Sequence, residues 1–509
     1  MILLAEKLDD VSDLDLSFKT IILILLFALL SGYFIDNFSS SIIGYYVSLI
    51  IFVTIVSCIF INLKIAYFLF IVFSLASPRF SRELVLQIIA SDNSSVDIFY
   101  SFHSVSLVGF SLSSLTIMIF GFYSIFKICL TAARFSPKIT IHISAILLVL
   151  LILIVSTFIN TIVGGFFDFR AVISDLRLYL IALCAICFTH YMVSLLGVNY
   201  IMKITFRAIL VSTVIIGVRT IVFMISDYLN MTVKLEFSTE PYSSYAVMFA
   251  VLMSKLPHFK KFVLVFISFL ASISMKRLDM AMFVACVLIM LLSFLVTRSR
   301  RDLNHSRQSF VLMLIIISAI LFLIAIYLPK SFNFLTYKLS FFTQELWGES
   351  AMSGSASVRK YELVNIWSKN NNNIWAIFFG QGLGGYFDFT KTGYPIALGV
   401  SDFSRTELIS NMYQKPHSFL NFMLLKGGLF LLFSYCAIFF VSIYLSLRKL
   451  SVRRFLELEN NDLVPTHYWF LVFYSVFCLN MYWQPVHSFV FLILFICLLL
   501  SFKEKNVNS

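Results

Sequence analysis

The sequence predicts an all-α protein that crosses a membrane many times. Of its 509 residues, 60% are hydrophobic and only 13% are charged, a composition that is atypical of a soluble fold. Apolar runs of about 20 residues recur along most of the chain, which is the length that a helix needs to cross a bilayer core about 30 Å thick. Lysine and arginine gather mostly in alternate connections between these runs. These observations indicate a polytopic transmembrane helical protein with about 12 to 14 spans and one large outer loop that contains short helices.

The predicted helices follow the apolar runs along the chain. They cover residues 18–35, 42–62, 64–77, 104–127, 139–162, 176–198, 206–226, 242–256, 260–274, 278–297, 309–328, 427–447, 467–483 and 485–502. The runs at 64–77, 242–256 and 260–274 are short for a span of about 20 residues, which points to tilted, broken or re-entrant helices there. An acidic segment precedes the first run and no small-residue cleavage site follows it, so we expect a retained helix rather than a cleaved signal peptide.

Orientation follows from the positive charges, because short connections rich in lysine and arginine face the cytoplasm. The rich connections contain Lys127, Arg134, Lys138, Lys203, Arg207, Lys255, Lys260, Lys261, Arg298, Arg300, Arg301, Arg307, Arg448, Lys449, Arg453 and Arg454. Both termini are expected on the same side, in agreement with an even number of spans. This placement explains most of the net charge of +12, so we do not infer nucleic-acid binding from it.

The chain divides into four parts on this scheme. They are N-terminal membrane helices at 1–160, central membrane helices with basic residues at their outer ends at 161–328, a loop at 329–426, and C-terminal membrane helices at 427–509. The loop falls on the outer face, which is periplasmic in a cell with two membranes. Loops of about a hundred residues are uncommon and are usually functional. We therefore expect the polar chemistry of the protein in this loop.

Cysteine and histidine spacing gives no sign of a metal or a cofactor. The eight cysteines lie in or at the ends of apolar runs, where a free thiol behaves as a small apolar side chain. Cys184 and Cys187 form a CxxC pair, but the pair lies inside a predicted membrane helix without further ligands. No cluster of His, Cys and carboxylates has metal-ligand spacing, and no Ser-His-Asp arrangement can be recognised. The sequence thus predicts neither a metal site nor a cofactor.

Three features are predicted within the large loop. Residues 357–368 are predicted to form a helix, residues 370–373 are a run of four asparagines that interrupts it, and Gly380 to Gly385 form a glycine-rich turn. The turn lacks the strand-to-helix setting of a dinucleotide-binding fold and the Gly-Lys-Ser/Thr of a P-loop. We expect its glycines to permit a sharp bend or close backbone packing.

Basic residues are the first candidates for binding a substrate. Those predicted at the outer ends of helices or in the loop are Arg170, Arg177, Lys276, Arg277, Arg359 and Lys360. Arg219 lies within a predicted span, where an ionisable side chain more often faces a cavity or a partner, although snorkelling is the alternative. Arg359 and Lys360 begin a predicted helix, where the helix dipole disfavours cations. A bound phosphate would remove that conflict, but a solvated helix start explains the two residues equally well.

His417 is the candidate for proton transfer. Pro416 suits the first turn of a helix, so a helix is predicted to begin there, with His417 and Asn421 four residues apart on one face. A single histidine is more often structural, but histidine exchanges protons near neutral pH. Beside arginines that stabilise a phosphate leaving group, it is suited to take a proton from a hydroxyl. The carboxylates that could orient the imidazole are Asp168, Asp175, Asp402 and Glu407, and the sequence does not choose among them.

At these residues the chain resembles the O-antigen polymerase and ligase superfamily of bacterial integral-membrane glycosyltransferases. The similarity covers about residues 160–450 and includes the large outer loop before the last group of spans. Its elements are His417-Ser418 followed by nine residues and Gly428, Arg359 with Trp367 before the turn at Gly380 to Gly384, and the segment from Ser272 to Arg277 at an outer helix end. The usual ligase has about twelve spans, whereas this chain is expected to have more at its N-terminal end.

The resemblance implies a metal-independent, inverting glycosyl transfer without a cofactor at the outer face of the bacterial inner membrane. The donor would be an oligosaccharide on undecaprenyl pyrophosphate, and the acceptor a sugar hydroxyl. His417 would activate or position the acceptor, while Arg277 and Arg359 would bind the pyrophosphate and assist its departure. The predicted substrate-binding residues are Arg219, Arg177, Arg170, Lys276, Lys360 and Asn421. Membrane lipids and a chain-length regulator are the further partners expected.

Three functions remain open at this point. An O-antigen polymerase extends another lipid-linked repeat unit, whereas a ligase attaches the glycan to lipid A core. Polymerase is preferred because the chain is rich in Phe, Ile, Asn and Ser and has extra predicted spans. A lipid-linked glycan flippase or other transporter is the third alternative. It is disfavoured because its charges should lie near the middle of the membrane, whereas the polar groups here gather at one face.

Overall fold

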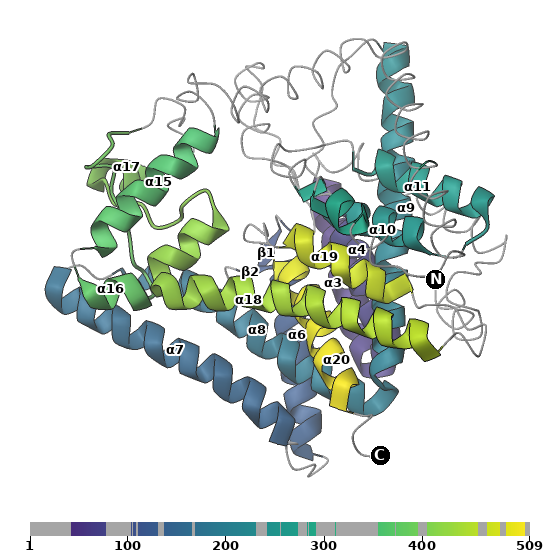
Figure 1. The fold of residues 1–509 in the computed structure, drawn as a ribbon, viewed down its shortest axis with the longest axis horizontal. Coiled ribbons are helices and arrows are strands. Elements are labelled where there is room, and N and C mark those ends of the chain that lie inside the picture. The colour runs from purple at the N-terminus through teal and green to yellow at the C-terminus, as the bar shows by residue number, and fades with distance from the viewer. Residues whose placement is uncertain are drawn as a thin grey trace.

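The computed structural model is mostly helical (Figure 1). It describes residues 42–77, 103, 105–107, 110–130, 137–164, 168–230, 242–254, 256–272, 282–283, 285–291, 311, 355–371, 373–394, 405–456, 466–478 and 485–503. Within these residues, six helices are long and apolar enough to span a membrane: they contain Gly44–Ile61, Leu112–Leu130, Ile143–Ile162, Phe169–Leu196, Val198–Ile221 and Phe419–Leu450. The predicted helical fold with several candidate membrane spans is confirmed to this extent. The predicted span 18–35 lies outside the described residues.

Most of the helices form one bundle. They are α3 (Ile42–Ile61), α4 (Leu63–Ala76), α6 (Leu112–Leu130), α8 (Phe169–Leu196), α9 (Val198–Asn230), α10 (Tyr242–Met253), α11 (His258–Leu270), α19 (Thr466–Cys478) and α20 (Pro485–Lys503). The helix α7 (Pro137–Gly164) extends from the bundle to one side, and α18 (Phe419–Leu456) begins on that side and crosses the bundle, where it packs against α19. A short antiparallel hairpin of β1 (Ser106–Leu107) and β2 (Phe110–Ser111) precedes α6, with Ser106 opposite Ser111.

Aromatic rings fill the centre of this bundle. Phe120 lies with its ring centroid 5.5 Å from that of Phe70, 4.9 Å from that of Phe188 and 6.5 Å from that of Phe489, so one residue connects helices α4, α6, α8 and α20. All four side chains are buried. Aromatic pairs at these separations stabilise a core beyond the area that they bury. The short apolar helix α4 is therefore a central element, packed against neighbours along most of its length.

A second, smaller group of helices forms a lobe beside the bundle. It consists of α15 (Ser355–Asn370), α16 (Ile374–Phe379) and α17 (Arg405–Ser410), together with the described coil up to residue 418. Figure 1 shows this lobe at the end of α7 and beside the beginning of α18. The predicted helix at 357–368 is confirmed as part of α15. The asparagine break is confirmed as well, because Asn370 is the last residue of α15 and Asn373 caps α16.

The boundaries of α8 and α9 differ from the prediction. The sequence predicts spans at 176–198 and 206–226, whereas α8 begins at Phe169 and α9 at Val198, with only Gly197 between them. Gly197 has a φ of 77°, a conformation that glycine adopts without strain. Asp168 caps α8 by accepting hydrogen bonds from the N–H groups of Arg170 and Ala171. The polar residues predicted to form connections therefore belong to the ends of long helices.

The predicted helix start at Pro416 is wrong, since α18 begins three residues later at Phe419. The first helical hydrogen bond runs from the N–H of Phe422 to the carbonyl of Ser418. His417 lies before the helix because its own N–H donates to the carboxylate of Glu362, in another part of the lobe. Farther on, α18 is kinked at Gly428, where φ is 58°. A side chain at residue 428 would clash with the backbone of Phe378 in α16.

Candidate functional site

A histidine and a glutamate from two different elements meet at the candidate site. Glu362 extends from α15 and its side chain is fully buried, whereas the side chain of His417 is 29% exposed. The Nδ1 atom of His417 lies 2.6 Å from Oε1 of Glu362. The backbone N–H of His417 also donates to both carboxylate oxygens, at 3.0 and 2.9 Å. The carboxylate thus holds both the backbone and the ring of this histidine.

This arrangement assigns roles to the two ring nitrogens of His417. An ionised carboxylate only accepts hydrogen bonds, so Nδ1 carries the hydrogen that points at Glu362. The remaining nitrogen, Nε2, is then the one that can take up a proton. A carboxylate in this position orients the imidazole and stabilises the imidazolium that forms. The partly exposed ring and the buried carboxylate together have the form of a general base.

Asn421 is the third residue that contacts this site. Its Nδ2 donates to the backbone carbonyl of Arg359 at 2.9 Å and lies 3.5 Å from Oε2 of Glu362. Asn421 is in the first turn of α18 and is buried. One amide therefore fixes α18 against α15, so that Glu362 lies opposite His417. The predicted shared helical face of His417 and Asn421 is wrong, because His417 precedes α18, although both side chains contact Glu362. The predicted part of Asn421 in substrate binding stays a prediction.

The carboxylate partner of His417 is not among the four predicted candidates. Asp168 caps α8 and accepts a hydrogen bond from Nε2 of Gln414 at 2.7 Å, which lowers the pKa of its carboxyl. Glu407 accepts from the backbone N–H of Gln414 at 3.1 Å, and Asp402 lies outside the described residues. The sequence did hold a signal for Glu362, which follows Arg359 by one helical turn in a helix that was predicted correctly.

The glycine turn packs the lobe against α7 and α18. Gly380, Gly382 and Gly384 all have positive φ values, between 69° and 78°. A side chain at Gly380 would meet the backbone of residues 426–428, and one at Gly382 would meet Thr157 in α7. The N–H groups of Gln381 and Gly382 donate to carbonyls of α18 at 2.7 and 2.9 Å. The predicted close packing of backbone at this turn is confirmed.

A buried ion pair holds the other side of the same turn. Nζ of Lys426, in α18, lies 2.7 Å from Oδ2 of Asp175 in α8, and the two side chains are 1% and 2% exposed. Lys426 also donates to the carbonyl of Gly385 at 2.6 Å, and Asp175 accepts from the N–H of Gly384 at 2.8 Å. This pair therefore joins α8, α18 and the glycine turn. Asp175 serves here rather than at His417.

A hydrogen-bonded pair of amides links the end of α15 to the same region. Asn370 donates from Nδ2 to the carbonyl of Leu424 at 3.1 Å and accepts from Nε2 of Gln381 at 2.9 Å. Because Asn370 ends α15, the contact fixes this helix at the end opposite to Arg359. The position of Glu362 is thus set at both ends of the helix that carries it.

The predicted basic residues are distributed over two regions. Arg359 is partly exposed and lies one turn before Glu362 in α15, and Lys360 next to it is exposed. Arg170 is exposed in the first turn of α8. These three residues remain candidates for binding an anion near the lobe. Lys276 and Arg277 lie outside the described residues, so the roles assigned to them stay predictions.

Arg177 and Arg219 are held by groups of the bundle. The Nη2 of Arg177 donates to the hydroxyls of Ser111, at 3.2 Å, and Ser114, and the guanidinium lies 5.7 Å from the ring centroid of Phe110. Arg219 is 2% exposed and its Nη1 donates to the carbonyl of Ala76 at 3.0 Å. Ala76 is the last residue of α4, where a cation is favourable to the helix dipole. These contacts give both arginines a packing role, and their part in substrate binding stays a prediction.

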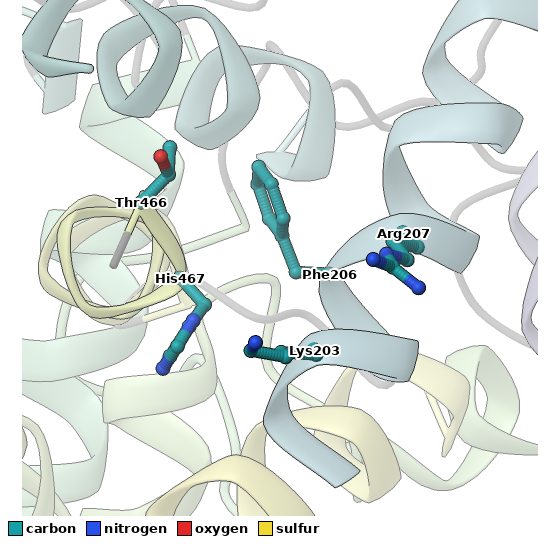
Figure 2. Close-up of a pocket in the computed structure, with 5 residues that line it drawn as sticks. All are labelled: Lys203, Phe206, Arg207, Thr466 and His467. Carbon is teal, nitrogen blue, oxygen red and sulfur yellow. The ribbon is translucent and has the colours of Figure 1, made fainter. Parts of the chain in front are cut away.

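A cavity lies elsewhere in the bundle, between α9 and the first turn of α19. It is lined by Lys203, Phe206, Arg207, Thr466 and His467. Figure 2 shows the side-chain nitrogen of Lys203 directed toward His467 across this cavity. None of the predicted site residues lines this cavity.

The residues that the structure describes include no group of three or more His, Cys, Asp and Glu side chains that could hold a metal ion. Comparison of the chain with protein families, curated proteins and solved structures gives no match. The conclusion about function therefore depends on the site itself. The fold is that of a helical chain with several candidate membrane spans. In its site a buried glutamate orients a partly exposed histidine.

Proposed function

We propose that the protein is a membrane glycosyltransferase of the O-antigen polymerase type. It would transfer a glycan from undecaprenyl pyrophosphate to a sugar hydroxyl of another lipid-linked repeat unit, at the periplasmic face of the inner membrane. The Glu362–His417 pair carries this proposal. Its 2.6 Å contact between a buried carboxylate and a partly exposed imidazole is the arrangement that activates a hydroxyl for attack.

The chemistry follows from the roles of the two side chains. Nε2 of His417 takes the proton of the acceptor hydroxyl, and the oxygen forms a bond to the anomeric carbon. The bond from that carbon to the pyrophosphate breaks on the opposite side, and the diphosphate leaves with the electron pair. This displacement inverts the anomeric centre. Glu362 stabilises the imidazolium while the new bond forms.

The departing diphosphate needs a cationic environment, because negative charge develops on it as the bond breaks. Arg359 lies one turn from Glu362 on a partly exposed position, and a guanidinium can hold two phosphate oxygens at once. Arg277 is the second residue proposed for this role, and Lys360 and Arg170 are the neighbouring cations. A lysine in place of Arg359 would be a poor substitute, since a point charge lacks the forked geometry.

The test uses purified protein in liposomes with defined lipid-linked repeat units. The wild-type chain should lengthen them, whereas His417→Ala and Arg277→Ala should insert normally and give no longer product. Lys391→Ala is the matched control, because this lysine is exposed in the same lobe and takes no part in the proposed chemistry. Translocation of the substrate without longer product would contradict the enzyme and support a transporter.

A deletion strain separates the polymerase from the ligase. Lipopolysaccharide that carries a single repeat unit in the deletion strain is the result expected for a polymerase, because attachment continues while extension stops. Loss of even the single-repeat product would show that the protein attaches the glycan to lipid A core. That outcome would replace polymerase by ligase while leaving the roles of His417 and Arg359 in place.

A further inference from the structure

The short helix α16 of the lobe exposes apolar side chains. Its sequence is Ile-Trp-Ala-Ile-Phe-Phe. Ile374 is 75% exposed and Phe378 is 50% exposed, although α16 itself packs against α7, α15 and α18. Figure 1 places α16 between α7 and the beginning of α18, at the base of the lobe. Exposed apolar residues that adjoin one another need an apolar partner.

Several polar groups of α16 and its ends are bonded to protein atoms. Asn373 accepts a hydrogen bond from the N–H of Trp375 at 2.9 Å, and the N–H of Gly380 donates to the carbonyl of Ala376 at 2.9 Å. The carbonyls of Phe379 and Gly380 accept from α7, from Ser156 at 3.2 Å and from Asn160 at 3.1 Å. Backbone that is paired in this way can enter hydrocarbon without a large free-energy cost.

Helix α7, which forms hydrogen bonds to the end of α16, is a candidate membrane span with an outward apolar face. Only 11% of the Ile143–Ile162 window is buried inside the protein. The exposed side chains include Leu151, Ile154, Phe158 and Ile162, which recur at helical spacing on one face. Ser156 and Asn160, on the other side, contact α16. The outward faces of α7 and α16 therefore adjoin at this end of α7.

The apolar surface continues onto α18. The ring of Phe379, at the end of α16, lies with its centroid 5.9 Å from that of Phe430. Phe430 is 37% exposed and Phe433, one turn farther along, is 66% exposed. Both belong to the Phe419–Leu450 stretch that is long and apolar enough to span a membrane. Helix α16 thus lies between two candidate spans, with its free face continuous with theirs.

We propose that α16 is inserted into the lipid, where Ile374 and Phe378 contact the acyl chains that also cover α7 and α18. The lobe is then anchored to the membrane by this helix in addition to the chain connections at its ends. The insertion does not depend on the proposed function. If that function holds, α16 keeps the Glu362–His417 pair near the bilayer surface, where the reacting part of a lipid-linked sugar is presented.

Spin labels at residues 374 and 378 test the insertion in liposomes. The native cysteines are replaced first, because the described chain has eight free ones. Labels at Leu151, on the outward face of α7, and at Lys391, exposed in the lobe, are the references. The proposal predicts that labels at 374 and 378 relax faster with oxygen than with a water-soluble nickel chelate, as at residue 151. The label at 391 should show the opposite ratio.

A nickel accessibility at 374 and 378 equal to that at 391 would show that α16 lies in water and would overturn the proposal. Low accessibility to both reagents would show that protein, such as a second copy of the chain, covers this face, and would overturn it too. A photoreactive amino acid at residue 374 provides the same test with all cysteines in place. It should cross-link to phospholipid, and the same group at residue 391 should not.

Discussion

Two close side-chain pairs lie where the lobe meets α8 and α18, Lys426 with Asp175 and His417 with Glu362, and they differ in how much of each pair is covered. In Lys426–Asp175 both side chains are sealed, at 1% and 2% exposed. In His417–Glu362 the carboxylate is fully buried but the imidazole is 29% exposed. The N···O distances are nearly the same, at 2.7 and 2.6 Å. The difference lies in access, since only the second pair can exchange a proton with a molecule from outside.

The hydrogen bonds around the two pairs lead to the same distinction. Lys426 and Asp175 each form a hydrogen bond with a backbone group of the glycine turn, at Gly385 and Gly384. The polar atoms of this pair therefore bind other groups of the protein. Glu362 likewise uses its oxygens on His417 and Asn421. The side chain of His417 is 29% exposed, so a molecule from outside can reach its ring. The sealed pair is thus expected to determine stability and the open pair to determine activity.

Removing the cation of the sealed pair should have the largest effect on folding. Lys426→Met leaves the carboxylate of Asp175 buried without a partner, which costs about 3–5 kcal/mol. Unfolding of the purified protein in detergent with increasing denaturant measures this loss. Adding Asp175→Asn should recover most of it, because the amide is neutral and its oxygen still accepts from Gly384. Equal stability of the single and double variants would show that the buried charge is not the cause.

Removing the carboxylate of the open pair should affect activity more than folding. Glu362→Gln keeps an oxygen acceptor for the N–H of His417, so the stability loss should be about 1–3 kcal/mol. The kcat should fall strongly with little change in KM, because the imidazolium is no longer stabilised. An unchanged kcat per folded molecule, with only a loss of folded protein, would indicate a purely structural role.

The hydrogen bond from Gln414 to Asp168 should have a smaller effect on the free energy of unfolding, and this effect should depend on pH. Gln414→Leu removes the hydrogen bond to Asp168 and should cost about 1 kcal/mol at neutral pH. The hydrogen bond lowers the pKa of the Asp168 carboxyl below its ordinary value of 3.8. The ionised carboxylate therefore stabilises the fold above pH 3.8, and this stabilisation is lost as the pH falls through the lowered pKa of the folded protein. Denaturant unfolding at several pH values should show a weaker loss in acid for the variant than for the wild type.

The smallest predicted effect concerns a lysine in the last turn of α15. Lys369 lies 3.6 Å from Asp388 and 3.2 Å above the ring centroid of Tyr386. Burial lowers its pKa to about 8, and Asp388 offsets only part of this shift. A lowered lysine pKa favours the neutral amine, so burial of the charge destabilises the fold below pH 8 and this cost disappears as the pH rises toward 10.5. Acylation of Lys369 should therefore increase near pH 8 in the folded protein and at higher pH after denaturation.

The elements that depend on local sequence could be predicted. The helix at 357–368 and the asparagine break follow from side chains close in sequence, as does the bend at Gly380 to Gly385. Helix ends were predicted less well. Asp168 and Gly197 extend α8 and bring α9 directly after it, because a cap and a glycine outweigh the decline in hydropathy. These signals were present in the sequence but were weaker than the apolar runs.

The pairing of the site could not be predicted in the same way. Glu362 and His417 are 55 residues apart, and their contact arises from the docking of α15 on α18 through Asn370, Gln381 and Asn421. The sequence shows none of these long-range contacts. It also places Pro416 at a helix start, an expectation that fails because Glu362 takes the N–H of His417. The positions of polar residues were therefore predictable, whereas their partners depended on the tertiary fold.

The most direct test of the division between the open and sealed pairs is the turnover of His417→Ala, measured on protein whose unfolding transition matches that of the wild type. The account predicts a loss of about 10²- to 10⁴-fold in transfer of the lipid-linked glycan, with Lys391→Ala at wild-type activity. Full turnover of the folded His417→Ala variant would contradict it.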